Sequence, residues 1–564
     1  MTSDAHYDAV IVGSGFGGSV TAYRLAEAGK RVLVLERGRA YPPGSFTRSP
    51  YRARESFWDP PHGLKGMYHY WSFRGIDALV SAGLGGGSLI YANVFIRKDE
   101  RWFVHEDTSD GGYENWPVTR ADLDPHYDRV EKVMGLQRFP FEHEPYASTP
   151  KTIAFKAAAE ANGMEWFLPQ LAITFANEGR PPVPGEAIVE PHPNLHGRTR
   201  TTCQMCGECD VGCNYGAKNT LDYTYLTRAA RAGAELRTLC DVRRFEPREG
   251  GGYTVHYADL NEDAAPGPRT LSCDHLVLSA GTLGTTELLL RNRAAFPRLS
   301  RKLGTHFCGN GDLLTLILNT SEQGADGVRV PRIVDPGYGP VITSTARMPD
   351  AVDGGEGRGF YLQDAGYPQH LAWVLHVLAA PKQLWRWRKA GMFLVKNWLQ
   401  GTVDTDVTAQ LADLMLPAEL SAGGLPLLGM GRDVPDGRLF LRKGRLDTDW
   451  TRQESAPYFA RMRATSRHFA DALGGRYMDN PLWFLRRVIT VHPLGGAPMG
   501  RDAGEGVVDA WGNVFGYPGL HVADGSVMPG PTGPNPSFTI AALADRFADR
   551  IIDPDRRAAE AAVS

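Results

Sequence analysis

The chain has 564 residues and a formal net charge of −3. A chain with this near-neutral net charge has no overall positive potential to attract phosphates, so its charge does not indicate a nucleic-acid partner. The apolar content of 42 % and the charged content of 22 % are ordinary globular values and exclude a disordered chain. Glycine, 64 residues or about 11 % against a typical ~7 %, indicates many tight turns or places where the backbone approaches a ligand.

Neither a membrane span nor a signal peptide is expected. The longest apolar run, Leu371 to Ala380, contains His376 and is far shorter than the ~20 residues that cross a bilayer. The N-terminus has no basic region followed by a cleavage site. We therefore expect a cytoplasmic protein without a transmembrane segment.

The first 35 residues are typical of a β-α-β unit. Tyr7 to Val12 and Arg31 to Leu35 are short β-branched apolar runs, which predict buried parallel strands. A helix is expected between them from Ser19 to Ala28, and Gly29 suits the position just past its end.

A G-x-G-x-x-G motif, formed by Gly13, Gly15 and Gly18, lies between the first strand and the helix of this unit. In a dinucleotide-binding turn the first glycine makes the tight turn, the second admits the pyrophosphate, and the third lets helix and strand pack closely. The positive end of the helix then faces the phosphates. Glu36 ends the second strand, where an acid accepts a hydrogen bond from a ribose hydroxyl, which favours FAD or NAD over NADP.

Further elements follow in alternation. A Pro- and aromatic-rich segment at 41–71 is expected to be a cover or loop rather than regular structure. Helices are predicted at 125–134, 155–162, 223–232, 285–291 and 537–552, and strands near Val242 and at 253–257 and 275–279. Because dinucleotide-binding patterns recur at the start, middle and end, we expect an α/β Rossmann-like domain of 1–45, 80–130, 200–318 and 485–560. An inserted α+β substrate domain, a mixed sheet covered by helices, would comprise 46–79, 131–199 and 319–484.

Several short motifs follow one another along the chain. They are Glu36-Arg37-Gly38, Gly85-Gly86-Gly87-Ser88, Val277-Leu278-Ser279-Ala280-Gly281, His492-Pro493-Leu494-Gly495-Gly496, Val522-Ala523-Asp524-Gly525-Ser526 and Asn535-Pro536. In this order they resemble the glucose–methanol–choline (GMC) family of FAD oxidoreductases, and in particular its cholesterol-oxidase-like members. The resemblance covers both ends and the middle of the chain.

The resemblance implies an FAD cofactor and roles for the matched residues. Asn535 would lie beside the isoalloxazine, and Val242 would lie against the adenine. Asp524 and Gly525 would lie near the ribityl and phosphate portion. The flavin and its pyrophosphate would be lined by Gly86, Gly87, Ser88 and Asn93.

The matched residues also suit the oxidation of an alcohol. Hydride leaves the carbinol carbon for flavin N5 only as the hydroxyl proton departs, so a base must lie within ~3 Å of that oxygen. His492 is the candidate base, because imidazole titrates near neutrality. Asn535 cannot act as a base but can hold the substrate oxygen or polarise the flavin edge.

We therefore expect the oxidation of a hydrophobic, sterol- or terpenoid-like secondary alcohol, with oxygen or an electron carrier as the acceptor. The alternative from another class is a non-catalytic flavin redox sensor. One departure from the resembled enzymes concerns a glutamate that moves a proton during double-bond isomerisation. Gln363 stands at that position, and glutamine cannot exchange a proton. The neighbouring Asp364 would face the opposite side of its strand, so we expect oxidation without isomerisation.

Four of the seven cysteines, Cys203, Cys206, Cys209 and Cys213, have the spacing of a bacterial ferredoxin run. An iron–sulfur cluster there would favour a dehydrogenase, as in some GMC-type enzymes. However, Asn214 replaces the usual proline and there is no second run. A zinc site, or structural thiols and disulfides, are the other interpretations.

The stretch Lys382 to Leu399 mixes basic and aromatic residues at roughly helical spacing. It is interpreted as a half-buried helix that roofs a pocket. A peripheral contact with a membrane surface is the alternative.

Overall fold

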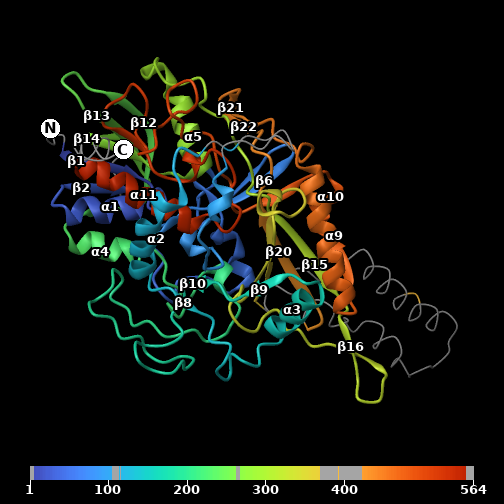
Figure 1. The fold of residues 1–564 in the computed structure, drawn as a ribbon. Coiled ribbons are helices and arrows are strands. Elements are labelled where there is room, and N and C mark those ends of the chain that lie inside the picture. Colours follow the sequence, from blue (N-terminus) through green and yellow to red (C-terminus); the bar gives the residue numbers. More distant parts are fainter. Residues whose placement is uncertain are drawn as a thin grey trace.

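The computed structural model describes residues 5–104, 114, 116–261, 267–368, 392 and 422–553. Two sheets organise these residues, and Figure 1 shows them next to each other. The predicted stretch Lys382 to Leu399 lies outside the described residues, apart from Met392 alone.

The first sheet has seven strands and is the expected Rossmann-like layer. Its order is β11 (Glu235–Arg237), β2 (Val32–Leu35), β1 (His6–Val12), β14 (Pro268–Leu278), β13 (Tyr253–Asp259) and β12 (Cys240–Pro247), with β25 (Leu520–Val522) also paired to β14. β1 is parallel to β2 and β14, as its continuous apolar sequence predicts. The strands come from the start, middle and end of the chain, so the layer is assembled from discontinuous segments.

Helices cover this sheet. Helix α1 (Phe16–Glu27) packs against α4 (Tyr225–Arg231) and α11 (Ser537–Ile552), and α11 packs in turn on α2 (Arg120–Met134), a cluster visible in Figure 1. Helix α5 (Gly281–Arg291) follows β14 directly. Arg24 of α1 donates to Asp545 and Asp549 of α11 at 2.5 Å, which links the first helix to the last.

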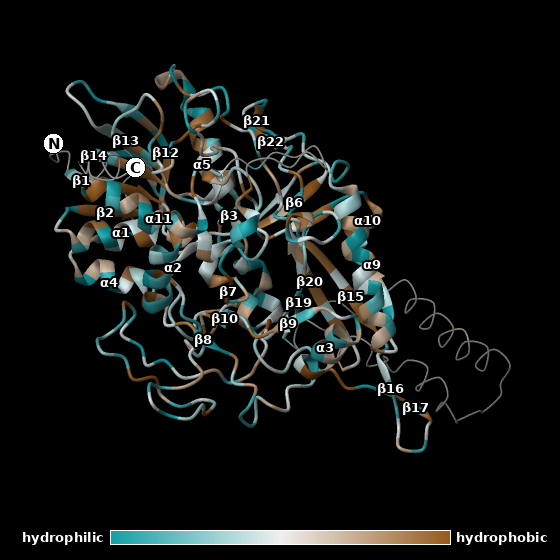
Figure 2. Ribbon diagram, in the orientation of Figure 1, coloured by the Kyte–Doolittle hydropathy of each residue, from teal (hydrophilic) through white to brown (hydrophobic). Residues whose placement is uncertain are grey.

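The second sheet has six antiparallel strands. Its order is β23 (Arg476–Asp479), β15 (Leu313–Leu318), β20 (Leu425–Gly431), β19 (Phe360–Asp364), β18 (Thr345–Met348) and β9 (Glu165–Phe167). Helices α3 (Pro150–Ala161) and α9 (Ala456–Ala472) pack on it. Figure 2 shows β15 and β20 mostly in the hydrophobic colour, whereas the helices are mixed.

Smaller elements connect the two layers. β5 (Tyr68–Ser72), β6 (Ile76–Ser81) and β24 (Val488–Thr490) form one three-stranded sheet, and β7 (Val94–Phe95), β8 (Gln137–Arg138) and β10 (Gln170–Leu171) form another. Further elements among the described residues are the pairs β3 (Trp58–Asp59) with β4 (Leu64–Lys65), β16 (Ser321–Gln323) with β17 (Arg329–Pro331) and β21 (Leu439–Arg442) with β22 (Arg445–Thr448), the short helix α10 (Pro481–Phe484) and several 3-10 turns.

Several elements differ from the sequence-based expectation. The segment 41–71 contains the short strands β3 to β5 as well as irregular structure. β15 belongs to the second sheet although its residues fall in the segment 200–318 expected in the first domain. Helix α2 begins well before Pro125, because Thr119 and Asp122 form a reciprocal capping box at its start.

Candidate active site

A cavity of about 1710 Å³ lies where the carboxyl ends of β1, β2 and β14 meet the second sheet. This is the edge at which open parallel sheets bind their ligands. Among the predicted site residues, it is lined by Gly13, Gly15, Glu36, Gly86, Gly87, Asn93, Val242, His492, Asp524, Gly525 and Asn535.

The glycine motif has the geometry of a dinucleotide-binding turn. Gly13 has φ +97°, and a Cβ there would lie 2.3 Å from the carbonyl oxygen of Ser279. Gly18 does not line the cavity; its backbone lies against Gly13, where a Cβ would be 2.0 Å from the carbonyl oxygen. Gly15 faces open space in the cavity wall. These three environments suit a turn that a pyrophosphate approaches closely.

Glu36 is buried at the end of β2 and holds the same turn together. Its carboxylate accepts hydrogen bonds from Ser14 N at 3.0 Å, Ser14 Oγ at 2.6 Å and Gly38 N at 2.8 Å. A carboxylate has about four acceptor positions, so one is left for a ligand hydroxyl. Its predicted contact with a ribose stays a prediction.

The second glycine cluster contributes two residues to the cavity and one to the framework. Gly86 packs on Gly15, and Gly87 faces open space. Ser88 is fully buried behind them; its Oγ donates to Gly85 O at 2.7 Å and accepts from Leu221 N at 3.0 Å. Ser88 is not among the lining residues, so in this structure it supports the loop rather than the cavity wall.

Asn93 is a polar residue whose surroundings point to a ligand. It is fully buried, has φ +69° and lines the cavity, yet neither its side-chain oxygen nor its nitrogen has a hydrogen-bond partner. Buried amides are almost always paired, so such a group marks a place that a bound molecule completes. This observation fits a polar cofactor in the cavity.

Asp524 ties the end of β25 to the start of α5. Its carboxylate accepts from Ser526 N at 2.9 Å and Oγ at 2.6 Å, from Gly281 N at 2.9 Å and from Thr285 Oγ1 at 2.5 Å. Burial raises the pKa of Asp524, and these hydrogen bonds oppose the rise. Asp524 therefore fixes the helix N-terminus that borders the cavity.

His492 is paired with a carboxylate that the sequence did not reveal. His492 Nδ1 lies 2.8 Å from Asp312 Oδ1, and both residues line the cavity. The other oxygen of Asp312 accepts from Thr490 Oγ1 at 3.0 Å and Val491 N at 2.9 Å. Because a carboxylate only accepts, Nδ1 carries the hydrogen and Nε2 is the ring nitrogen that can take a proton.

Asn535 is paired with Gln363 of β19. The Nε2 of Gln363 donates to Asn535 Oδ1 at 2.8 Å and to Thr345 Oγ1 at 3.3 Å, and all three side chains are buried. Asp364 points the other way, as predicted, and accepts from the backbone of Thr343 and Ser344.

The wall that the second sheet contributes is apolar. Leu314 and Leu316 of β15 and Pro426 and Leu428 of β20 line the cavity, while Leu313 and Ile317 belong to the core, as alternation along a strand requires. The wall continues through Val341 and Ile342.

The four clustered cysteines lie in a separate place. They line a small cavity of about 20 Å³, and none of the seven cysteines forms a disulfide. Burial raises the pKa of Cys206 to about 12 and that of Cys203 well above its usual range. In the described part of the chain, no group of three or more His, Cys, Asp or Glu side chains is arranged to hold a metal ion. The expected iron–sulfur or zinc site therefore has no support in this geometry.

Fold and site together define a dinucleotide-dependent oxidoreductase. Family profiles described as GMC oxidoreductase match residues 193–308 and 448–544, and a profile described as NAD(P)-binding Rossmann-like domain matches 11–72. A cholesterol oxidase of Mycobacterium tuberculosis is 31 % identical over 96 % of this chain and 90 % of its own length. The chain belongs to the GMC oxidoreductase family, whose members are flavin enzymes acting on CH–OH groups.

Two further relatives cover almost the whole chain. A cholesterol oxidase of Acinetobacter baumannii is 28 % identical over 96 % of this chain and 93 % of its own length. A long-chain-alcohol oxidase of Arabidopsis thaliana is 25 % identical over 97 % of this chain and 67 % of its own length. None of the described helices is long and apolar enough to cross a membrane.

Proposed function

We propose that this enzyme oxidises a hydrophobic, sterol- or terpenoid-like secondary alcohol to a ketone, with His492 as the base. The observation that carries the proposal is the pair of His492 and Asp312, which lines the same cavity as an apolar wall. The relatives named as cholesterol and long-chain-alcohol oxidases support the substrate class.

The dinucleotide end of the cavity fits FAD. The unpartnered amide of Asn93, the open Gly15 and Gly87, and the remaining acceptor capacity of Glu36 are the groups that a flavin dinucleotide would complete. Val242, Asp524 and Gly525 line the same cavity and would contribute to its binding. FAD, when bound, would accept the hydride of the alcohol, which carries both electrons of the oxidation.

The protein's own part is to orient the alcohol and accept its proton. Nε2 of His492 takes the hydroxyl proton, and Asp312 stabilises the imidazolium that results. Gln363 holds both ends of the Asn535 amide, since its Nε2 donates to Asn535 Oδ1 at 2.8 Å and its Oε1 accepts from Asn535 Nδ2 at 3.5 Å. The second hydrogen of Nδ2 is left for the substrate oxygen or the cofactor edge. Leu314, Leu316 and Leu428 exclude water and hold the carbon skeleton.

Product analysis tests this proposal. The FAD-loaded enzyme is incubated in air with matched hydrophobic and polar secondary alcohols, and the products are identified by mass spectrometry. The proposal expects ketones from the hydrophobic alcohols, with oxygen as the acceptor. Conversion of none of them in air, together with a bound flavin that no alcohol reduces anaerobically, would favour the redox-sensor alternative.

The dehydrogenase alternative rests on the cysteines. Lys218 is buried beside them; its Nζ donates to the carbonyl oxygens of Leu89, Tyr91 and Cys209 at 3.1, 2.9 and 2.8 Å. Burial raises the pKa of the Cys209 thiol, and the positive charge of Lys218 opposes this rise without reversing it. The lack of a metal-binding arrangement argues against this alternative. Iron and acid-labile sulfide assays on anaerobically purified protein decide between the two acceptors.

A further inference from the structure

One short segment contacts His492 and the loop that leads to Asn535. Residues 309–312 lead into β15, and Asn310 and Gly311 have φ +53° and φ +67°. The Oδ1 of Asn310 accepts from Thr532 Oγ1 and Gly533 N, and its Nδ2 donates to Pro534 O, each at 3.1 Å. Its side chain therefore binds the loop that ends at Asn535.

The same segment carries the partner of the base. Asp312, two residues after Asn310, holds His492 at 2.8 Å. The segment is itself anchored from two sides: Gly309 N donates to Asp433 Oδ2 at 3.0 Å, and Tyr458 OH donates to Gly311 O at 3.0 Å. The backbone of this segment therefore fixes the position of the loop and also that of His492.

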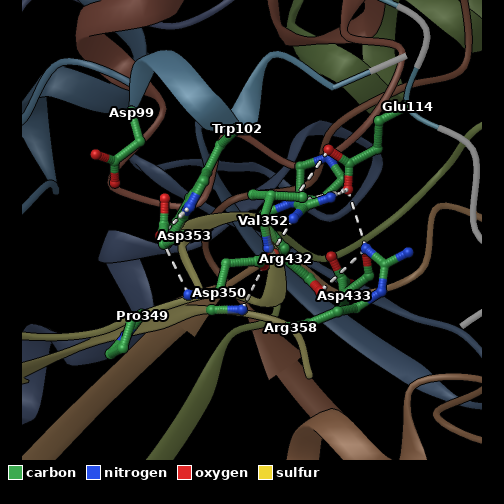
Figure 3. Close-up of polar contacts among 12 residues, drawn as sticks. Asp99, Trp102, Glu114, Pro349, Asp350, Val352, Asp353, Arg358, Arg432 and Asp433 are labelled. Atoms are coloured by element: carbon green, nitrogen blue, oxygen red, sulfur yellow. Dashed lines mark hydrogen bonds and ion pairs between the residues drawn. The ribbon is translucent and has the colours of Figure 1, made fainter. Parts of the chain in front are cut away.

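The far side of the loop rests on a buried charged network. Lys98 Nζ donates to Pro531 O at 2.9 Å and Thr532 O at 3.2 Å. Gly530 lies against Glu114, and Figure 3 shows the Glu114 carboxylate between the guanidinium groups of Arg358 and Arg432. The loop is therefore held between this network and Asn310.

We propose that Asn310 is a positioning residue, which sets Asn535 relative to His492 through the loop 532–534. The inference rests on the proposed function, because it assigns Asn535 a role in the reaction. Asn310 is fully buried, and its three side-chain hydrogen bonds all go to that loop. A residue needed only for its positive φ would be replaced by glycine without loss, since glycine adopts this conformation freely.

Asn310→Gly separates the two roles, because it keeps the backbone conformation and removes all three hydrogen bonds. We expect the rate of flavin reduction by alcohol to fall roughly 10²-fold while FAD stays bound, since small misplacements of reacting groups cost about that much. In an Asn535→Ala background the same change should have no further effect. Asn319→Gly is the matched control: this exposed asparagine at the other end of β15 also has positive φ, +56°.

Hydrogen–deuterium exchange gives a readout that does not depend on turnover. The backbone amides of Thr532, Gly533 and Asn535, the residues between 532 and 536 that carry an N–H, should exchange faster in Asn310→Gly than in the wild type or in Asn319→Gly. Thr532→Val, which removes the hydroxyl that contacts Asn310 at 3.1 Å and donates to Pro534 O within the loop at 2.7 Å, should act in the same direction with a smaller loss. It serves if Asn310→Gly does not fold. The inference is overturned if Asn310→Gly leaves the exchange unchanged. It is also overturned if Asn310→Gly slows flavin reduction equally in the wild-type and in the Asn535→Ala background. If no alcohol reduces the flavin of the wild type, the proposed function is contradicted instead. The exchange measurement still tests whether Asn310 positions the loop.

Discussion

Asp312 Oδ1 accepts a hydrogen bond from Nδ1 of His492 across 2.8 Å, and Asp312 itself is only 2 % exposed. Its other oxygen is held by Thr490 and Val491, so the carboxylate has little freedom to turn. The pair fixes both the plane of the imidazole and the nitrogen that is left to accept a proton. A base oriented in this way is what the removal of a hydroxyl proton requires.

Asp312→Asn should lower the rate of flavin reduction by roughly 10²-fold or more. The amide can donate to Nδ1, which leaves the hydrogen on Nε2, where the base must accept. Anaerobic stopped-flow reduction of the bound flavin measures this rate. Asp326→Asn, an exposed carboxylate in a hairpin turn, is the control. A rate equal to that of the wild type would show that the pair has no part in the proton transfer.

His492→Ala should slow the same half-reaction by roughly 10²- to 10⁴-fold and leave FAD bound. The bound flavin is quantified from its visible absorbance and the rate by stopped flow. His468→Ala, on the exposed face of α9, should leave both unchanged. An unchanged rate in His492→Ala would remove His492 as the base.

We predict that Gln363 leaves a β,γ double bond of the substrate in place. Its amide holds Asn535 at 2.8 Å and exchanges no proton, so a β,γ-unsaturated alcohol should leave the enzyme as the unconjugated ketone. Gln363→Glu should add the conjugated isomer, which ultraviolet absorbance detects. Gln363→Leu should not isomerise the product. It should also oxidise the alcohol more slowly, because leucine does not hold Asn535 by a hydrogen bond. Conjugated product from the wild type would contradict this assignment.

Asp433 should make the stability of the protein depend on pH. Burial raises its pKa to about 7, and Asp312 adds to the rise while hydrogen bonds from Gly309 and Gly311 and the charge of Arg358 oppose it. An unfolded aspartate titrates near ~3.9, so between the two values the folded state binds the proton more tightly. Its contribution to the free energy of unfolding therefore decreases as the pH rises from about 4 to about 7, by at most ~1.4 kcal/mol per pH unit.

Asp433→Asn does not ionise and should lack this decrease. The free energy of unfolding of the variant minus that of the wild type should therefore be larger at pH 8 than at pH 5. Urea unfolding at each pH measures this difference. Asp326→Asn again serves as the control. Parallel pH curves for the wild type and Asp433→Asn would contradict the raised pKa.

Local patterns were enough to predict the dinucleotide half of the fold. The apolar runs of β1 and β2 and the amphipathic α11 lie within a residue or two of the predicted bounds. α1 begins at Phe16, earlier than expected, because Gly17 and Gly18 pack on Ala523 and Gly13 and so are helical despite their weak propensity. Tertiary contact decides such boundaries, and the sequence does not display it.

The partners in the site could not be predicted in the same way. Asp312 and His492 are separated by 180 positions, and Gln363 and Asn535 by 172. The string Asn310-Gly311-Asp312 before an apolar strand does signal a turn, but nothing in it says which histidine or which loop the turn contacts. Conversely, a residue in a matched motif need not belong to the cavity wall. Ser88 supports the loop by hydrogen bonds and does not line the cavity.

Anaerobic titration of the FAD-loaded enzyme with a hydrophobic secondary alcohol tests the central claim most directly. The visible absorbance reports the oxidation state of the bound flavin, and the alcohol is the only reductant present. We predict that sterol-like and cyclic secondary alcohols bleach the flavin, and that they do so far more slowly in His492→Ala. Flavin that stays oxidised with every alcohol of this class would contradict the account.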